Sequence, residues 1–264
     1  MKKLMMSGWL MLFALPALAQ QHFDSPDKAS SALVEAISNQ NEAALNDLLG
    51  ENWQQYLPPE GADPQAVARF LRDWKVGHKI VEQGATAYLN VGREEWQLPI
   101  PMLKTAEGWH FDMAQAEDEI QTREIGRNEL AAIQAMHAYV DAQNDYHQRF
   151  QVYAQKFTSS EGKKDGLYWP TQPGDEPSPL GPAYSPAVPG EGYHGYRFRM
   201  IPDKDKQGFA LIAWPVAFGE TGIMSFMIDQ NDQVWQANLG EESTSKAQAI
   251  SLFAPEKPWQ EINQ

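Results

Sequence analysis

The stretch NELAAIQAMHAYVDAQNDYHQRFQVY, residues 128–153, decides the architecture of this chain. Its apolar and aromatic residues recur every three or four positions, which is the spacing of one face of an α-helix. The members of this stripe are Leu130, Ile133, Met136, Val140, Gln143, Tyr146, Phe150 and Tyr153. We therefore predict a long helix that begins between Glu117 and Asn128 and presents one face to a core for about six turns.

Four apolar or alternating runs follow this helix and predict an antiparallel β-meander. They cover residues 193–200, 209–216, 223–228 and 234–238. The segment between helix and meander, residues 159–192, contains seven prolines and is typical of a loop. Its large apolar residues indicate that this loop lies against the protein surface; they are Leu167, Tyr168, Trp169, Leu180 and Tyr184.

Upstream of the long helix, the pattern predicts three short helices followed by strands. Ser25-Pro26 and Asp63-Pro64 are helix-start signals, and a turn ending at Asn41 leads into the middle helix. Strands are predicted at 86–91, 96–103 and 109–113, with Pro99 and Pro101 placing the second at an edge or a bulge.

The expected fold class is therefore α+β. N-terminal helices and a curled antiparallel sheet precede a long helix packed on a four-stranded antiparallel meander. The expected divisions are a leader at 1–19, a cone-like domain at 20–115 and a helix–loop–meander domain at 116–264.

The leader has the pattern of a secretory signal peptide. Lys2 and Lys3 precede an apolar run from Leu4 to Leu15, and Ala17-Leu18-Ala19 supplies the small residues of a cleavage site. We predict cleavage between Ala19 and Gln20, export to a bacterial periplasm, and a disordered N-terminal tail that includes His22. No second run of membrane length follows, so we predict no direct membrane anchor.

Composition excludes several classes of chemistry. The chain has no cysteine, which removes disulfides, thiol nucleophiles, thiolate-ligated metals and lipoprotein anchors. Its formal net charge of −14 disfavours binding to nucleic acid and to anionic lipid. We predict no cofactor, and we expect the partner to be another envelope protein or a second copy of the chain.

The best candidate for a catalytic or binding site is the sequence GYHGYRFR with the later FGETG. On a strand, Tyr193 and Arg197 would point one way and His194 the other. A His194–Glu220 pair would suit general acid–base catalysis, and Arg197 would suit a carboxylate ligand. The alternative is that these residues only build the sheet, with Glu220 paired to Arg197 or Arg199 across strands.

Two weaker candidates have equally plain structural alternatives. His137 and Asp141 are four residues apart on one helical face, which suits either metal ligation or a solvated ion pair. Trp169 and Tyr184 suit either an aromatic ledge for a sugar or peptide, or a loop pinned to the core.

Three resemblances accompany these patterns. The N-terminal helices with NQNEAALNDLLG and EGWHFD resemble the nuclear transport factor two-like superfamily, which implies a cone-shaped fold that can enclose an apolar pocket. The C-terminal half, with FALIAWPV and GETGIMSFMIDQNDQVWQ, resembles the bodies of type IV pilins and pseudopilins but lacks their polymerising helix. KKDGLYWP, SPLGP, GYHGYRFR and FGETGIMSF together resemble the secreted family known as domain of unknown function 2950, which implies export and no assigned activity.

The prediction for function is a non-enzymatic interaction or assembly module. The alternative is a small-ligand-binding or hydrolytic protein that uses an N-terminal pocket or the His194/Glu220 surface.

Overall fold

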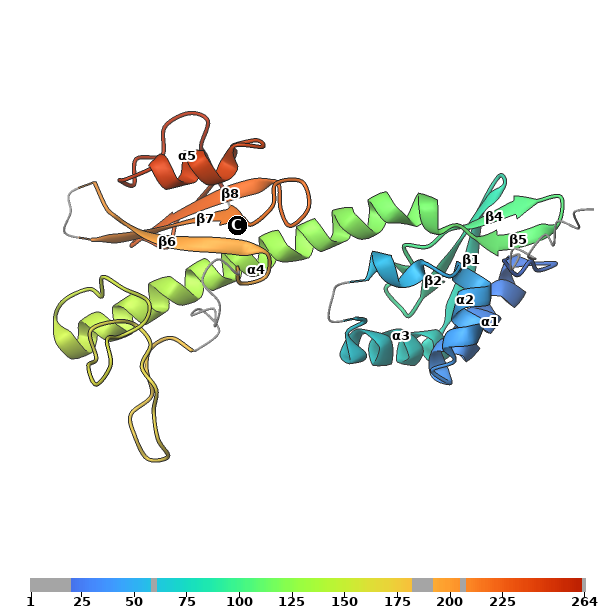
Figure 1. Cartoon of the computed structure of the whole chain (residues 1–264), viewed down its shortest axis with the longest axis horizontal. Coiled ribbons are helices and arrows are strands. Elements are labelled where there is room, and N and C mark those ends of the chain that lie inside the picture. The colour runs from blue at the N-terminus through green and yellow to red at the C-terminus, as the bar shows by residue number, and fades with distance from the viewer. Residues whose placement is uncertain (1–19, 58–60, 182–191, 205–207, 263–264) are drawn as a thin grey trace, which may run out of the picture. The chain divides into compact units, whose positions relative to one another are not determined.

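The computed structural model describes residues 20–57, 61–181, 192–204 and 208–262 (Figure 1). The chain forms two compact units, Met1–Ile120 and Gln121–Gln264. The boundary falls within the long helix α4 (Met113–Phe150). Each unit has buried apolar clusters of its own and is described separately.

The helices of unit 1 begin where local capping signals stand. They are α1 (Pro26–Ser38), α2 (Glu42–Leu49), a short 3-10 turn η1 (Trp53–Tyr56) and α3 (Pro64–Val76). The side chains of Ser25, Asn41 and Asp63 each accept a hydrogen bond from a backbone N–H of the first turn, as N-caps do. The predicted starts of α1, α2 and α3 are confirmed.

The sheet of unit 1 has five strands in the order β1-β2-β4-β5, with β3 paired to β2. Their bounds are β1 (His78–Gln83), β2 (Thr86–Val91), β3 (Trp96–Gln97), β4 (Met102–Thr105) and β5 (Gly108–Phe111). The predicted strand 96–103 is two short strands, because Pro99 and Pro101 have no N–H to donate to a neighbour. Residues from α1, α2 and the sheet fill the core, among them Leu33, Leu48, Leu89, Met102, Trp109 and Phe111.

Helix α4 begins at Met113, earlier than the sequence pattern predicted. The Asp112 carboxylate accepts a hydrogen bond from Gln115 N at 3.1 Å, which stabilises this first turn. The predicted apolar stripe is only partly right. Met136, Val140, Gln143 and Tyr146 are buried, but Leu130 and Phe150 are 63% and 39% exposed, and Tyr153 follows the end of the helix.

Unit 2 contains a five-stranded antiparallel sheet in the order β10-β9-β8-β7-β6. The strands are β6 (Tyr196–Pro202), β7 (Phe209–Pro215), β8 (Met224–Asp229), β9 (Val234–Asn238) and β10 (Gln260–Glu261). The meander was predicted with four strands; the two-residue β10 pairs with β9 near the end of the chain. Figure 1 shows α4 along one face of this sheet and α5 (Ser243–Ala249) on the other, which explains why every residue of β7 is buried.

The proline-rich loop is fastened to unit 2 by buried contacts. Leu167, Trp169 and Leu180 belong to the same core as α4 and the sheet. Gln143, fully buried on α4, donates to Ala154 O and accepts from Ala154 N, both at 2.9 Å, and so fixes the chain just after the helix. Within the described ranges, no helix has both the length and the apolar character needed to cross a bilayer.

Candidate functional site

The sequence GYHGYRFR does not run as one strand. Tyr193 N donates to Tyr196 O at 2.8 Å, and Tyr196 N donates back to Tyr193 O at 3.0 Å. His194 and Gly195 between them have φ of +48° and +72°, as in a two-residue type I′ turn. The predicted alternation of side chains across 193–196 is therefore wrong, because the chain reverses there and β6 begins only at Tyr196.

Tyr196, rather than His194, points into the core. Its side chain is fully buried and its hydroxyl donates to Met224 O at 2.8 Å. Burial raises the pKa of Tyr196 above its ordinary value, and the nearby Glu129 carboxylate raises it further. A neutral, buried phenol of this kind serves packing and strand registration.

His194 and Glu220 stand in adjacent turns, since a Cβ added at Gly195 would lie 2.8 Å from Thr221 Cβ, but they do not form a pair. Both are exposed, His194 packs edge-on against Tyr193, and no contact joins His194 to Glu220 among the described residues. The Glu220 turn is held instead by α4, whose Gln121 side chain donates to Gly219 O at 2.7 Å. The general acid–base pair predicted from the sequence is therefore not supported by a direct contact between the two side chains.

A half-buried carboxylate on α4, which the sequence analysis missed, completes this attachment. Glu129 Oε1 accepts from Ile223 N at 3.0 Å and from Met224 N at 2.9 Å, while Asn128 donates to Thr221 O at 3.1 Å. These bonds satisfy backbone groups at the start of β8. The only sequence signal for them is the polar pair Asn128-Glu129 beside the apolar stripe.

The two arginines of β6 have different surroundings. Arg199 donates from one guanidinium nitrogen to Ala247 O at 2.8 Å and to Ile250 O at 2.5 Å, at the C-terminal end of α5. The positive charge satisfies carbonyls that a helix end leaves free. Arg197 is half-buried and faces Trp214 across the β6–β7 pair. Arg199 is thus a capping residue, and its predicted cross-strand pairing with Glu220 is wrong.

The predicted aromatic ledge is not exposed where the structure describes it. Trp169 is 5% exposed, packs edge-on against Phe150, and has the Lys164 ammonium 5.2 Å from its ring centroid. It is a core residue of unit 2, which agrees with the alternative of a pinned loop. Tyr184 lies outside the described residues.

The predicted metal ligands His137 and Asp141 have different surroundings. His137 Nδ1 lies 2.6 Å from the Asp232 carboxylate of the β8–β9 turn, whereas Asp141 is exposed on α4. Among the described residues, no group of three or more His, Asp or Glu side chains is arranged to hold a metal ion. His137 therefore joins α4 to a sheet turn.

A serine–lysine contact in the proline-rich loop looks catalytic but is structural. Lys156 Nζ lies 2.8 Å from Ser160 Oγ and 2.7 Å from the Asp165 carboxylate. The bonds from Lys156 and from Ser160 N hold the pKa of Asp165 at about 2, so the carboxylate is charged. The Ser160 hydroxyl accepts from Lys156 Nζ and itself donates to Asp165 Oδ2 at 3.1 Å, so the three side chains bond to one another and close the loop.

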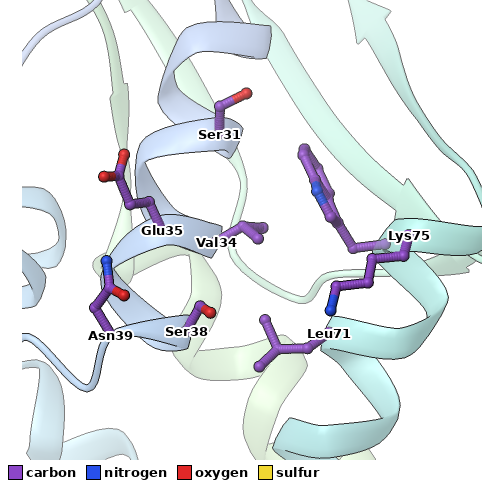
Figure 2. Close-up of a pocket in the computed structure, with 8 residues that line it drawn as sticks. Ser31, Val34, Glu35, Ser38, Asn39, Leu71 and Lys75 are labelled. Carbon is purple, nitrogen blue, oxygen red and sulfur yellow. The ribbon is translucent and has the colours of Figure 1, made fainter.

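A surface hollow lies in unit 1, between α1 and α3 (Figure 2). It measures about 420 Å³ and is open to solvent. Figure 2 shows Val34 from α1 and Leu71 from α3 pointing into it, and Trp74 lines it as well. Polar residues complete the lining: Ser31, Glu35, Ser38, Asn39 and Lys75. We call it the α1–α3 groove. It lies on the surface of unit 1, whose core is packed with buried side chains.

Helix α3 borders the groove with an apolar stripe that unit 1 covers only in part, although Phe70 and Trp74 pack against its core. Val67, Phe70, Leu71 and Trp74 are all only half-buried, and no residue of α3 is fully buried. The Trp74 ring stacks on His78 at 3.6 Å, and Phe70 contacts Trp96, which is 47% exposed. The sequence predicted the stripe but not its exposure, which depends on packing between elements.

Comparison with protein families places the whole described chain in one group. Residues 20–262 match the family described as "Protein of unknown function (DUF2950)". The chain belongs to the DUF2950 family. The DUF2950 match spans both compact units, so neither is an unrelated addition. No curated protein and no solved structure is significantly similar to the chain, and the resemblances to nuclear transport factor two-like and pilin folds stay predictions.

Proposed function

We propose that this chain is an exported periplasmic protein that works as a non-enzymatic interaction module, and that the α1–α3 groove is where it binds a partner. The observation that carries the proposal is the apolar stripe of α3, none of whose residues is fully buried, although Phe70 and Trp74 pack against the core of unit 1. An amphipathic helix normally buries its apolar face, because the burial supplies most of its stability. A stripe that keeps part of its apolar surface exposed is therefore typical of a surface that a partner covers.

The groove has a suitable composition for an apolar segment of another protein. Val34, Leu71 and Trp74 offer apolar surface, and Glu35 and Lys75 at the edges carry opposite charges. Exposed Val76 and Trp96, at 53% and 47%, extend the apolar area beyond the groove. Aromatic anchors within a polar rim are the usual make-up of protein–protein contacts.

The positions of the candidate catalytic and ligand-binding side chains support a role without catalysis. His194 and Glu220 have no mutual contact among the described residues, and Arg199 is occupied by the carbonyls of α5. His137 contacts Asp232. Residues that would have to act together for hydrolysis therefore serve separate local contacts.

A small-ligand-binding role is the second candidate, at the same groove. Its volume of about 420 Å³ falls within the range of small-molecule sites, and five of its lining residues carry hydrogen-bonding side chains. A ligand of this kind would be small and amphipathic. It would stack on Trp74 and bond to the polar rim.

Site-specific photo-crosslinking of the full chain in its native envelope tests the proposal. A photoreactive residue at position 71, in the groove, should give a discrete protein adduct, whereas one at exposed Ala66 on another side of α3 should give none. Equal adducts from both positions, or none from position 71, would overturn the protein-binding proposal. A small-molecule adduct seen by native mass spectrometry and lost in Leu71→Lys would favour the second candidate.

A further inference from the structure

The residues just after the predicted cleavage site are bound to unit 1 rather than disordered. Gln20 Nε2 donates to Leu48 O and to Phe111 O, each at 2.6 Å, so both amide hydrogens are engaged. Gln21 N donates to Asp47 O at 2.8 Å. The expectation of a disordered tail carrying His22 is thus wrong, since the His22 ring lies 4.9 Å from His110 of β5.

A glycine in β5 makes room for this N-terminal segment. Phe23 exchanges two backbone hydrogen bonds with Trp109, both of 2.8 Å. A Cβ on Gly108 would lie 2.6 Å from Phe23 O, and Gly108 has φ of +127°, a conformation that side chains disfavour. The segment Gln20–Phe23 therefore occupies a place that the sheet is built to receive.

Gln20 is also where two independent boundaries meet. The leader pattern predicts cleavage between Ala19 and Gln20. The DUF2950 match begins at residue 20. If the chain is exported and cleaved as proposed above, on which this inference rests, its first residue is a glutamine.

An N-terminal glutamine is chemically reactive. Its free α-amine attacks its own side-chain Cδ, so that a nitrogen–carbon bond forms, the Cδ–Nε2 bond breaks, and ammonia leaves with a proton from the amine. The product is the lactam pyroglutamate. The reaction needs a side chain free to turn toward the amine, and it removes Nε2 altogether.

We infer that Gln20 is the mature N-terminal residue and that the carbonyls of Leu48 and Phe111 hold its carboxamide, so that the folded protein keeps an uncyclised N-terminus. Cyclisation would delete the donor of both hydrogen bonds and leave two carbonyl oxygens without it. The side chain reacts only when the segment Gln20–Phe23 opens from unit 1.

Mass spectrometry of the mature protein, secreted with its own leader, provides the test. The intact mass and the N-terminal peptide identify the first residue. The protein is then incubated with a purified glutaminyl cyclase beside a synthetic peptide of residues 20–30, and loss of one ammonia is followed. The folded chain should lose ammonia at least about tenfold more slowly than the peptide, because it must open locally first.

Variants separate anchoring from general stability. Gly108→Ala and Phe23→Ala should both speed cyclisation, whereas Gly84→Ala should not, since Gly84 also has positive φ but no atom near its Cβ position. Phe23→Ala covers the case in which Gly108→Ala fails to fold. A first residue other than Gln20 would overturn the processing proposal together with this inference. A first residue Gln20 that cyclises at the rate of the peptide would overturn only the anchoring.

Discussion

The buried amide of Gln143 offers the sharpest test of how α4 and the proline-rich loop are joined. Replacing it by methionine keeps the approximate side-chain volume, so no large cavity forms. The substitution removes the donor to Ala154 O and the acceptor for Ala154 N, and Ala154 itself is only 3% exposed. Each of these two orphaned buried groups costs about 1–3 kcal/mol, so Gln143→Met should lower the free energy of unfolding of unit 2 by about 2–6 kcal/mol.

Hydrogen exchange measured by mass spectrometry suits this prediction, because the two compact units need not unfold together. Peptides that contain Ala154 should lose protection first, and peptides from unit 1 should not change. Gln148→Met is the matched control, since Gln148 is exposed on the same helix. If Gln143→Met stays within about 0.5 kcal/mol of Gln148→Met, the amide does not hold the loop and the reasoning is refuted.

Two pH effects and one steric effect follow from other parts of the molecule. The Lys156 contact holds the pKa of Asp165 at about 2, below its usual 3.8, so the loop should lose this stabilisation as the pH falls from 3.8 through about 2. In hydrogen-exchange measurements, Asp165→Asn should remove this pH dependence. Burial lowers the pKa of His110 below 6.5, so the unfolded state takes up the proton first as the pH falls. Unit 1 should therefore lose thermal stability below pH 6.5, and His110→Gln should reduce this pH dependence. Gly222→Ala should destabilise unit 2 by about 1–3 kcal/mol in urea, because the new Cβ would overlap the Tyr196 hydroxyl.

Each of these three test variants has a control variant elsewhere on the chain that we expect to have little effect. Glu161→Gln changes an exposed carboxylate of the same loop, and His78→Gln an exposed histidine of unit 1. Gly181→Ala adds a Cβ where no atom lies within 4 Å. If a counterpart variant behaves like its test variant, the cause named for that prediction is wrong.

Local patterns predicted the elements of the fold well. The caps of α1, α2 and α3 depend on side chains that bond within the first turn, so the sequence alone contains the whole interaction. The meander strands are found from alternation within one run, and their positions differ from the prediction by at most three residues at an end.

The candidate site failed for a physical reason. Side-chain alternation assumes an unbroken strand, and the positive φ of His194 and Gly195 reverses the chain after Tyr193. The roles of Arg199 and Gln20 were also missed, because each bonds to carbonyls tens of residues away in the sequence. Such contacts produce no periodic pattern in the sequence, since the carbonyl of any residue can accept a hydrogen bond whatever its side chain.

The arginine at the end of α5 has a consequence for exchanging parts between relatives. Helix α5 has seven residues and no side-chain N-cap bond, and its last carbonyls depend on Arg199 from β6. A chimaera that imports residues 243–253 from another DUF2950 protein without the matching β6 residue would receive a helix whose end is uncapped. Strand and helix therefore form one exchangeable part, although forty residues of chain separate them.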